Sequence, residues 1–354
     1  MTETPPDLAP DIATPDVRLC TSADEQAWEK FVGQSAAATF FHRFGWRKVI
    51  AEAFGHQPFY LAAVSADEIR GILPLFHIRS LLFGNSLISV PFCVYGGIVA
   101  QDEQAAAALA DAAMDHARRL GVDYLELRHE QPVLAWPAKS DRYVTFRKAI
   151  SADSDANLLA IPRKQRAMIR RAMKAELSSY QTTDTDALYS MYSESVRNLG
   201  TPVFAKRYFD LLQQQFGDDC ETTIVVSDGK PVAGVMSFYF KDQVLPYYGG
   251  GTAAARRVSA NDFLYWQVMC LAAERGTGVF DYGRSKVGTG SYRFKKHWGF
   301  DAEPLNYEYG LVKAAEIPDL SPANPRYSLF IRMWKKLPLA VAQRIGPMIA
   351  RNLG

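Results

Sequence analysis

The sequence predicts a mixed α/β fold made of two halves with a similar layout. Each half shows the same order of elements, which is a helix, a hairpin of antiparallel strands, a second helix and a further strand. The halves share this order but no motif, so the repeat is weak and suggests duplication of one α/β unit. We expect a first domain over residues 18–153 and a second, carrying the main motifs, over residues 154–318.

In the first half, the apolar residues of the segment 42–54 recur with the period of an amphipathic helix. An alanine-rich helix over residues 104–119 is followed by Gly121, which is typical of a helix C-terminus. Strands are expected over residues 59–64, 70–78, 123–128 and 143–149.

In the second half, Asp228-Gly229 marks a hairpin turn between two strands. Gly276 ends a helix that begins near Asp262. Helices are expected over residues 167–177, 185–198, 206–216, 262–275 and 292–297, and strands over residues 222–227, 232–241, 244–248, 279–282 and 305–312.

The composition is that of an ordinary folded protein. Of 354 residues, 48% are hydrophobic and 22% charged, and 40 Lys and Arg against 38 Asp and Glu leave a net charge of +2. This balance excludes a globally basic protein that coats nucleic acid. The four cysteines are far apart and no Cys/His cluster has zinc spacing, so we expect reduced thiols, no metal and a cytoplasmic location. Dehydrogenase, P-loop and serine-hydrolase motifs are absent from the sequence.

Three segments of the chain could be disordered tails or could contact a membrane. Residues 1–17 are acidic and proline-rich and lack the regions of a signal peptide, so we expect a disordered tail. Residues 80–100 carry no charge and could span a bilayer by length, but their turn residues and β-branched side chains favour buried strands. Residues 319–354 are basic and amphipathic, either a helix packed on the body or a peripheral element at the inner membrane.

A run of basic residues opens the second half. If this run is helical, Arg163, Arg166, Arg170 and Lys174 share one face. Four cations on one stripe repel one another, so a phosphate, a nucleotide or an RNA backbone would offset their charge. The alternative is a solvated face with carboxylate partners within the fold, although only Glu176 lies nearby in sequence.

Tyrosines followed by glycines stand at matching places in the two halves. Tyr247 and Tyr248 end a strand and precede three glycines, which permit close approach of a ligand to the backbone. Tyr95 precedes Gly96 and Gly97 in the first half, a parallel that supports the duplication. The alternative is a plain loop with buried tyrosines.

An aspartate and several cations follow a strand near the end of the second half. Asp281 lies at the strand end, where it could accept a proton from an amine. Arg284 and Lys295 come after it and could hold phosphate or stabilise an oxyanion. The alternative is an Asp–Arg ion pair that only orders the loop.

On these motifs the chain resembles the FemAB-like (Fem ligase) family of acyl- and aminoacyltransferases, and within it the FemAB-type proteins associated with exosortase/PEP-CTERM gene clusters. The resemblance implies two GNAT-like domains, no metal, and transfer of an amino acid from aminoacyl-tRNA to an amine of a peptidoglycan precursor. The motifs are IPRKQRAMIRRAMK, PVAGVMSFYF, LPYYGGG, NDFLYWQVMCLAAERGTGVFDYGRS and GSYRFKKHWGF.

The resemblance also implies roles for individual residues. By position, Asp281 and Tyr248 are the catalytic candidates for accepting the amine proton, and Lys295 is a third catalytic candidate that contacts phosphate or the oxyanion. The substrate-binding candidates are Arg163, Arg166, Arg170, Tyr247, Asn261, Arg284, Tyr292 and Tyr95.

We therefore expect an N-acyl or aminoacyl transferase acting on a precursor of the cell envelope or of an exopolysaccharide, by attack of an amine on an activated acyl ester or thioester. No tightly bound cofactor is expected, and aminoacyl-tRNA or acyl-CoA is the co-substrate. The expected partners are an anionic or lipid-linked precursor and, in the aminoacyl case, tRNA. The alternatives are a GNAT enzyme dependent on acyl-CoA or acyl carrier protein, and a non-enzymatic scaffold at the membrane surface.

Overall fold

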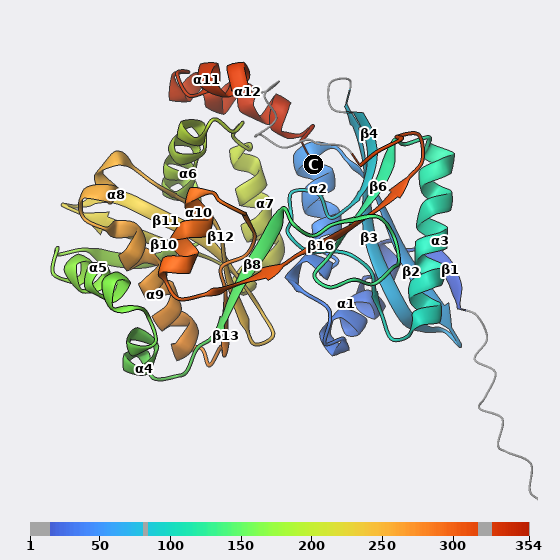
Figure 1. The fold of residues 1–354 in the computed structure, drawn as a ribbon, viewed down its shortest axis with the longest axis horizontal. Helices are drawn as coiled ribbons and strands as arrows, with labels where there is room; N and C mark the ends of the chain where they lie inside the picture. The colour runs from blue at the N-terminus through green and yellow to red at the C-terminus, as the bar shows by residue number, and fades with distance from the viewer. Residues whose placement is uncertain (1–14, 81–83, 318–327, 354) are drawn as a thin grey trace, which may run out of the picture.

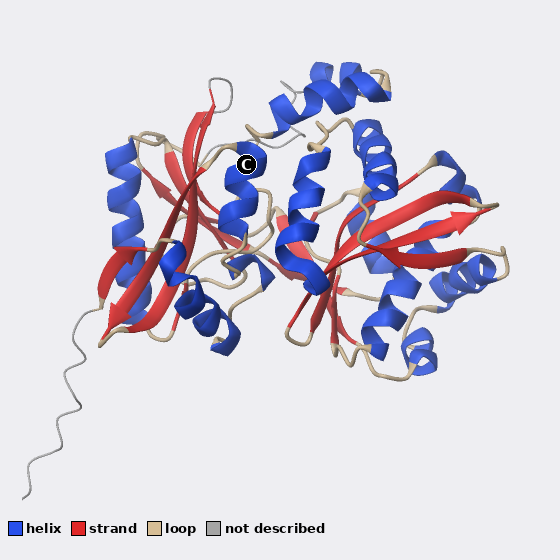
Figure 2. Cartoon of the chain, turned by 180° about the vertical axis from the view of Figure 1, so that it is seen from behind, coloured by secondary structure: helices blue, strands red, loops and turns tan. Residues whose placement is uncertain are grey.

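Two mixed sheets covered by helices stand side by side in this protein (Figure 1; Figure 2). The structure, a computed structural model, describes residues 15–80, 84–317 and 328–353. It confirms the α/β fold of two similar halves.

The first sheet is antiparallel except where β4 runs parallel to β6. Its strand order is β1-β2-β3-β4-β6-β16-β7, with β5 paired to β3. The strands are β1 (Asp16–Leu19), β2 (Gln57–Ser65), β3 (Glu68–Ser80), β4 (Gly84–Ser89), β5 (Val99–Ala100), β6 (Tyr124–His129), β7 (Ala138–Lys139) and β16 (Asn306–Leu311). Strand β4 lies in the uncharged segment for which strands were expected, and β1 begins within the expected tail.

The helices of the first half pack on both faces of this sheet. The α3 helix begins where the Asp102 side chain accepts a hydrogen bond from the Ala105 N–H and ends at Gly121, which has φ of +60°. The helices are η1 (Ser22–Asp24), α1 (Glu25–Gln34), η2 (Phe40–His42), α2 (Trp46–Phe54) and α3 (Glu103–Leu120).

The second sheet repeats this plan, with one parallel pair, β12 and β13, among antiparallel neighbours. Its order is β14-β8-β13-β12-β11-β10-β9, with β15 paired to β8. The expected hairpin turn is confirmed, since Asp228 and Gly229 both have positive φ. The strands are β8 (Tyr143–Ala149), β9 (Ser178–Thr182), β10 (Cys220–Ser227), β11 (Lys230–Phe240), β12 (Gln243–Gly251), β13 (Val279–Asp281), β14 (Ser285–Lys286) and β15 (Asp301–Pro304).

The basic helix begins directly after Pro162, whose fixed backbone angle suits a helix start. Helix α9 ends before Gly276, as expected. The helices of the second half are α4 (Ser154–Leu159), α5 (Arg163–Met173), α6 (Asp186–Leu199), α7 (Lys206–Phe216), η3 (Gly217–Asp219), α8 (Ala253–Arg257), α9 (Ala260–Glu274) and α10 (Gly290–His297).

Two strands lie in the sheet of the opposite half (Figure 1). Strand β8 falls within residues 18–153 but pairs with β13 and β15 of the second sheet. Strand β16 falls within residues 154–318 but lies between β6 and β7 of the first sheet. The expected boundaries therefore separate these strands from their partners, because hydrophobic periodicity identifies a strand without identifying its neighbour.

One apolar core runs through both halves. It includes Trp28 and Trp46 from the first half and Tyr208 from the second. Phe40 stacks on Phe238 across the boundary, with ring centroids 4.4 Å apart. The shared core fixes how the two sheets lie relative to each other.

Two C-terminal helices, α11 (Ser328–Trp334) and α12 (Leu339–Ala350), lie along the outer side of the second half (Figure 1). Helix α12 packs closely on the chain around Val203, because a Cβ on Gly346 would lie 2.7 Å from the Val203 carbonyl oxygen. The His56 Nε2 atom lies 2.7 Å from the Arg351 carbonyl oxygen, so the tail also reaches the first half. Residues 318–327 of the expected tail lie outside the described ranges. None of the helices in the described chain has the length and apolar character that crossing a bilayer needs.

Candidate active site

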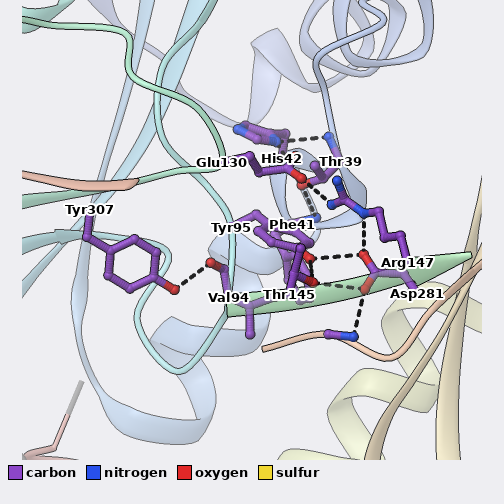
Figure 3. A network of polar contacts seen from close by, with 11 residues as sticks. Thr39, Phe41, His42, Val94, Tyr95, Glu130, Thr145, Arg147, Asp281 and Tyr307 are labelled. Carbon is purple, nitrogen blue, oxygen red and sulfur yellow. Dashed lines mark hydrogen bonds and ion pairs between the residues drawn. The ribbon is translucent and has the colours of Figure 1, made fainter. Parts of the chain in front are cut away.

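Asp281, at the end of β13, is fully buried and accepts four hydrogen bonds (Figure 3). Tyr95 OH and Arg147 Nε donate to Oδ2 at 2.9 and 2.8 Å. Thr145 Oγ1 and the Gly283 N–H donate to Oδ1 at 3.1 and 2.6 Å. Tyr95 comes from the first half, and Thr145 and Arg147 come from β8. We call this meeting point of Tyr95, Thr145, Arg147 and Asp281 the seam.

The charge of Asp281 is compensated within the seam. Arg147 forms ion pairs with both Asp281 and Glu130, and its guanidinium lies 4.9 Å from the Tyr95 ring centroid. Tyr95 OH and Thr145 Oγ1 also lie 2.5 Å apart, so these two hydroxyls share two protons among three contacts, while Arg147 Nε and the Gly283 N–H each donate to Asp281. Asp281 thus forms an ion pair with Arg147 of β8 and a separate hydrogen bond with the loop that follows β13.

Tyr95 is presented by a loop, residues 90–97, in an unusual backbone conformation. Val90 and Phe92 have φ of +39° and +69°, and Gly96 has φ of +141°. A β-branched residue such as Val90 is rarely left-handed, and such residues cost about 1–3 kcal/mol each. The surrounding contacts must therefore hold this loop in place.

Side chains from four other elements bind the carbonyl groups of this loop. Three of these side chains come from the first sheet or from its adjoining η2, and one comes from β12. The bonds run from Arg128 Nη1 to the Cys93 oxygen (2.7 Å), from Tyr307 OH to Val94 (2.6 Å), from Tyr247 OH to Phe92 (3.2 Å) and from His42 Nε2 to Gly97 (3.0 Å).

A buried His–Glu pair closes the end of the loop. His129 Nε2 accepts the Ile98 N–H at 2.9 Å, so the ring proton lies on Nδ1, which is 2.6 Å from a Glu308 carboxylate oxygen. Gly97 makes room for this ring, because a Cβ there would lie 2.0 Å from His129 Cδ2. Strand β16, which supplies Glu308, thus helps to fix the first-half side of the seam.

Lys295 lies on the second-half side of the seam. Its Nζ donates to the carbonyl oxygens of Gly283 and Arg284 at 2.8 and 3.1 Å. Burial lowers the pKa of Lys295 to about 7, with an opposing contribution from Asp281 and a further lowering by Arg284. Gly283 links the two candidates, since its N–H binds Asp281 and its carbonyl binds Lys295. An amine with this pKa can accept or release a proton near neutral pH.

Arg284 is half-buried, and no carboxylate among the residues that the structure describes pairs with its guanidinium. Its Nη1 donates to Tyr307 OH at 3.0 Å, and its guanidinium lies 4.5 Å from the Tyr143 ring centroid. Within the described ranges it forms no ion pair. A partly desolvated guanidinium with unused donors is suited to a phosphate, a carboxylate or an oxyanion.

Strand β12 carries Tyr247 and Tyr248, and it pairs with β13 through its first residues. Its parallel pairing with β13 ends at Val244 opposite Phe280, and a bulge at Tyr247 shifts its register with β11. Tyr248 OH bonds Tyr208 OH at 2.7 Å, and burial raises the pKa of Tyr248 well above its usual value.

The structure does not bring the basic helix to the seam. Arg163 and Arg170 are exposed on α5, at the outer edge of the second half (Figure 1; Figure 2). Arg166 is half-buried and donates to the Leu159 carbonyl oxygen at 3.2 Å. In the described part of the chain these three arginines form no ion pair, so an anion remains a suitable partner for this helix.

The remaining two candidates pack within the second half. Asn261, at the start of α9, lies beside the end of β12, because a Cβ on Gly251 would be 2.9 Å from its Oδ1. Tyr292 packs edge-to-face on Phe146 of β8 at 5.4 Å. Since side chains alternate along a strand, Tyr292 lies on the face of β8 opposite to Arg147.

Sequence reasoning missed the residues that join the halves, namely Thr145, Arg147 and Glu130, and also Arg128, which binds the 90–97 loop. They belong to no motif. The only signal is the polar half of the alternating pattern in β8, which resembles an ordinary solvent-facing side of a strand. Among the described residues, no group of three His, Cys, Asp or Glu side chains is arranged to hold a metal ion.

A wider hollow of about 450 Å³ lies apart from the seam. It opens beside α1 and α2, and Glu25, Arg47, Lys48 and Glu52 are among its lining residues. No residue of the seam lines it. A void of about 10 Å³ lies next to Tyr95, close to the smallest volume that can hold one water molecule.

Comparison with known proteins agrees with this architecture. Residues 163–296 match the acetyltransferase (GNAT) domain family. The structure of FemX is similar with a TM-score of 0.68 and 14% identity, covering 89% of this chain and 100% of that chain. A tandem GNAT protein from the clavulanic acid biosynthesis pathway is similar with a TM-score of 0.54 and 13% identity, covering 86% and 99%.

A third similar structure is the C-terminal domain of a protein from Agrobacterium fabrum assigned as a lysylphosphatidylglycerol synthetase. Its TM-score is 0.54 at 15% identity, covering 81% of this chain and 91% of that chain. A comparison with curated proteins gives no match. These identities establish the fold, so the expected tandem GNAT-like architecture and the resemblance to FemAB-like proteins are confirmed at that level.

Proposed function

We propose, from the GNAT acetyltransferase domain over residues 163–296 and the tandem fold shared with FemX, that the chain transfers an acyl or aminoacyl group to an amine. The reaction is assigned to the second-half side of the seam. Two neighbouring groups carry this assignment. Arg284 is a half-buried cation with no carboxylate partner in the described chain, and Lys295, which binds the Arg284 carbonyl oxygen, is an amine of pKa about 7.

The chemistry needs a stabilised oxyanion and a proton acceptor. A neutral amine attacks the acyl carbonyl, the new C–N bond forms, and the C–O or C–S bond to the donor breaks. Arg284 can stabilise the negative charge that develops on the carbonyl oxygen or bind a phosphate of the donor. Lys295, when neutral, can take the proton that leaves the attacking nitrogen, and the leaving oxygen or sulfur is protonated in turn.

Asp281 and Tyr248 are assigned supporting roles in this proposal. Both carboxylate oxygens of Asp281 are engaged by hydrogen bonds, one of them from the Gly283 N–H, so in this proposal Asp281 positions Gly283 and thereby the loop that Lys295 holds. Tyr248 is buried with a raised pKa, so it stays protonated, and its hydroxyl is assigned a hydrogen-bonding role with Tyr208.

Two kinds of donor are consistent with the proposal. One similar structure is named for lysylphosphatidylglycerol synthesis and another is a GNAT protein described without AcCoA, so aminoacyl and acyl-CoA donors both remain candidates. The acceptor is proposed to be an amine on an envelope or exopolysaccharide precursor. If this precursor carries phosphate, Arg284 and the exposed arginines of α5 would attract it.

A ligand panel tests the binding part of the proposal. Thermal unfolding of the purified chain is measured with acetyl-CoA, a long-chain acyl-CoA, a charged tRNA and a UDP-linked muropeptide, because a ligand raises stability by RT ln(1 + [L]/Kd). Arg284→Met should abolish the shift given by the true ligand. Arg293→Met is the matched control, since Arg293 lies in the same region but is exposed and binds only the Gly288 carbonyl. Equal loss in both variants would contradict the role of Arg284.

The pH dependence tests Lys295. Because the neutral amine is the acceptor, the transfer rate should rise with pH through about 7 and level off above it. Lys295→Met should lower the rate by about 10²–10⁴-fold and remove this rise. A profile that is unchanged in the variant would refute the assignment of Lys295 as the acceptor.

A further inference from the structure

The outward face of α11 combines exposed apolar side chains with cations. Leu329 and Met333 are 59% and 63% exposed. Arg332 and Lys336 are also exposed. Because these four residues are spaced by three, four and seven positions, they form one stripe along the helix and the turn that follows it.

Helix α12 carries a second stripe of the same kind. Val341 and Met348 are 41% and 69% exposed, and the exposed Arg344 and Arg351 lie between and beyond them. The spacing of 341, 344, 348 and 351 places all four on one side of the helix. Two apolar and two basic residues thus alternate on each helix. We call these eight residues the C-terminal face.

The opposite sides of the two helices are already in use. Trp334, Ala342, Gly346 and Ala350 are buried against the body of the protein. Gln343 Nε2 also donates to Ser193 Oγ on α6 at 3.0 Å. The helices are therefore docked in a fixed orientation along the edge of the molecule (Figure 1), and the residues of the C-terminal face are exposed.

We propose that the C-terminal face binds the surface of an anionic lipid membrane. Exposed Leu and Met side chains gain free energy by entering the acyl boundary, and adjacent cations are attracted to anionic headgroups. Residues 321–354 contain no Asp or Glu, so no carboxylate of the segment repels such a surface. The binding requires neither a substrate nor the chemistry at the seam.

The charge pattern argues for lipid rather than for a second copy of the chain. In a symmetric dimer, this face would meet itself and bring its own cations together. Helix α5 offers the contrast, because its exposed residues Arg163, Arg170, Arg171 and Lys174 are accompanied by few apolar side chains. A purely electrostatic partner such as a nucleic acid would suit α5 better than the mixed C-terminal face.

Flotation with vesicles tests the proposal on the full chain. The vesicles contain phosphatidylcholine alone or phosphatidylcholine with phosphatidylglycerol, at low and at physiological salt. The wild type should float only with the anionic vesicles, and less at the higher salt. The double variant Met333→Ser/Met348→Ser should bind at least about tenfold more weakly, and Arg332→Gln/Arg344→Gln about thirtyfold more weakly.

The matched control is Arg170→Gln/Arg171→Gln on α5, which removes the same charge from an exposed helix away from the C-terminal face. Control and test variants are first shown to have the wild-type melting temperature. Flotation that persists in the α5 control and is lost in both C-terminal variants supports the proposal. Equal losses in all variants, equal flotation with neutral vesicles, absence of flotation at low salt, or a dimer that Met333→Ser/Met348→Ser dissociates would each overturn it.

Discussion

The two Tyr-Gly-Gly segments occupy matching places in the two halves but differ in backbone. In the first half, β4 ends at Ser89 and the chain turns into a loop whose Val90 is left-handed. In the second half, β12 continues as a strand to Gly251, with a bulge at Tyr247. The same short sequence signature thus marks a strained loop in one half and a continuous strand in the other.

The glycines of these segments make room for different groups. Gly97 leaves space for the His129 ring, whereas Gly250 leaves space for the backbone of α6, since a Cβ there would lie 2.5 Å from the Met191 oxygen. In both cases the glycine is explained by packing within the chain, although the sequence suggested close approach of a ligand. A glycine run therefore predicts a close contact without predicting the partner.

The tyrosines differ in the same way. Tyr95 reaches across the seam to Asp281, whereas Tyr248 stays in an aromatic cluster with Tyr208. The first half thus supplies contacts that hold the site, and the second half supplies Lys295 and Arg284. The comparison leads to three tests of how unequal the two halves are.

The largest effect is expected at the seam. Asp281→Ala should lower the free energy of unfolding by about 3–5 kcal/mol, because it leaves buried donors, among them Arg147, without their acceptor. Tyr95→Phe removes the hydroxyl that contacts both Asp281 and Thr145 and should cost about 1–2 kcal/mol. Urea denaturation of both variants and of the double variant measures these costs. Equal costs for the two single variants would mean that the first half contributes as much as the second.

A smaller effect is expected at the glycines. Gly250→Ala should cost about 2–3 kcal/mol, because its Cβ would meet backbone atoms of α6 that cannot move. Gly97→Ala should also be costly, because its Cβ would meet the ring of His129, which is buried and held by Ile98 and Glu308. Gly249→Ala is the control, with its nearest contact at 3.3 Å from Val235. A melting temperature of Gly97→Ala or Gly250→Ala that equals that of Gly249→Ala would contradict this explanation of the two glycines.

The smallest effect is a pH dependence confined to the first-half loop. Burial would raise the pKa of Glu308, but hydrogen bonds from His129 and from the N–H groups of Val133 and Leu134 outweigh it, so the pKa is lowered. The stabilisation is therefore complete above the ordinary glutamate pKa of about 4.3 and is lost as the pH falls through the lower folded-state value.

Glu308→Gln should accordingly cost about 1 kcal/mol at neutral pH, and less as the pH falls below about 4. Denaturation of wild type and variant across that range provides the measurement. A difference that stays constant with pH would show that the carboxylate charge of Glu308 does not hold the loop.

Local patterns predicted the elements of this fold well. The helix expected over residues 206–216 has the same bounds in the structure, and the turn at Asp228 and Gly229 has the positive φ that its sequence implies. Asp281 and Lys295 could be placed together because one short segment of chain, folded by local signals, contains both. Hydrophobic period and turn chemistry act over a few residues, and these features depend on nothing longer.

The partners of the site could not be predicted in this way. Tyr95 and Asp281 are 186 positions apart, and their contact depends on how two sheets dock. Arg147 looked like a surface residue of a first-half strand, since nothing in β8 indicates that it pairs with the second sheet. Conversely, the local spacing of the α5 arginines predicted a binding site, but this helix lies at the outer edge of the second half, away from the seam.

The exchange of β8 and β16 limits how this protein can be dissected. A cut between residues 153 and 154 would leave an N-terminal fragment that lacks β16 and carries β8 as an unpaired strand, which invites aggregation. The C-terminal fragment would lack β8, the strand to which β14 and β15 pair. We therefore expect neither piece to fold on its own and the two fragments to acquire structure by complementation when they are co-expressed.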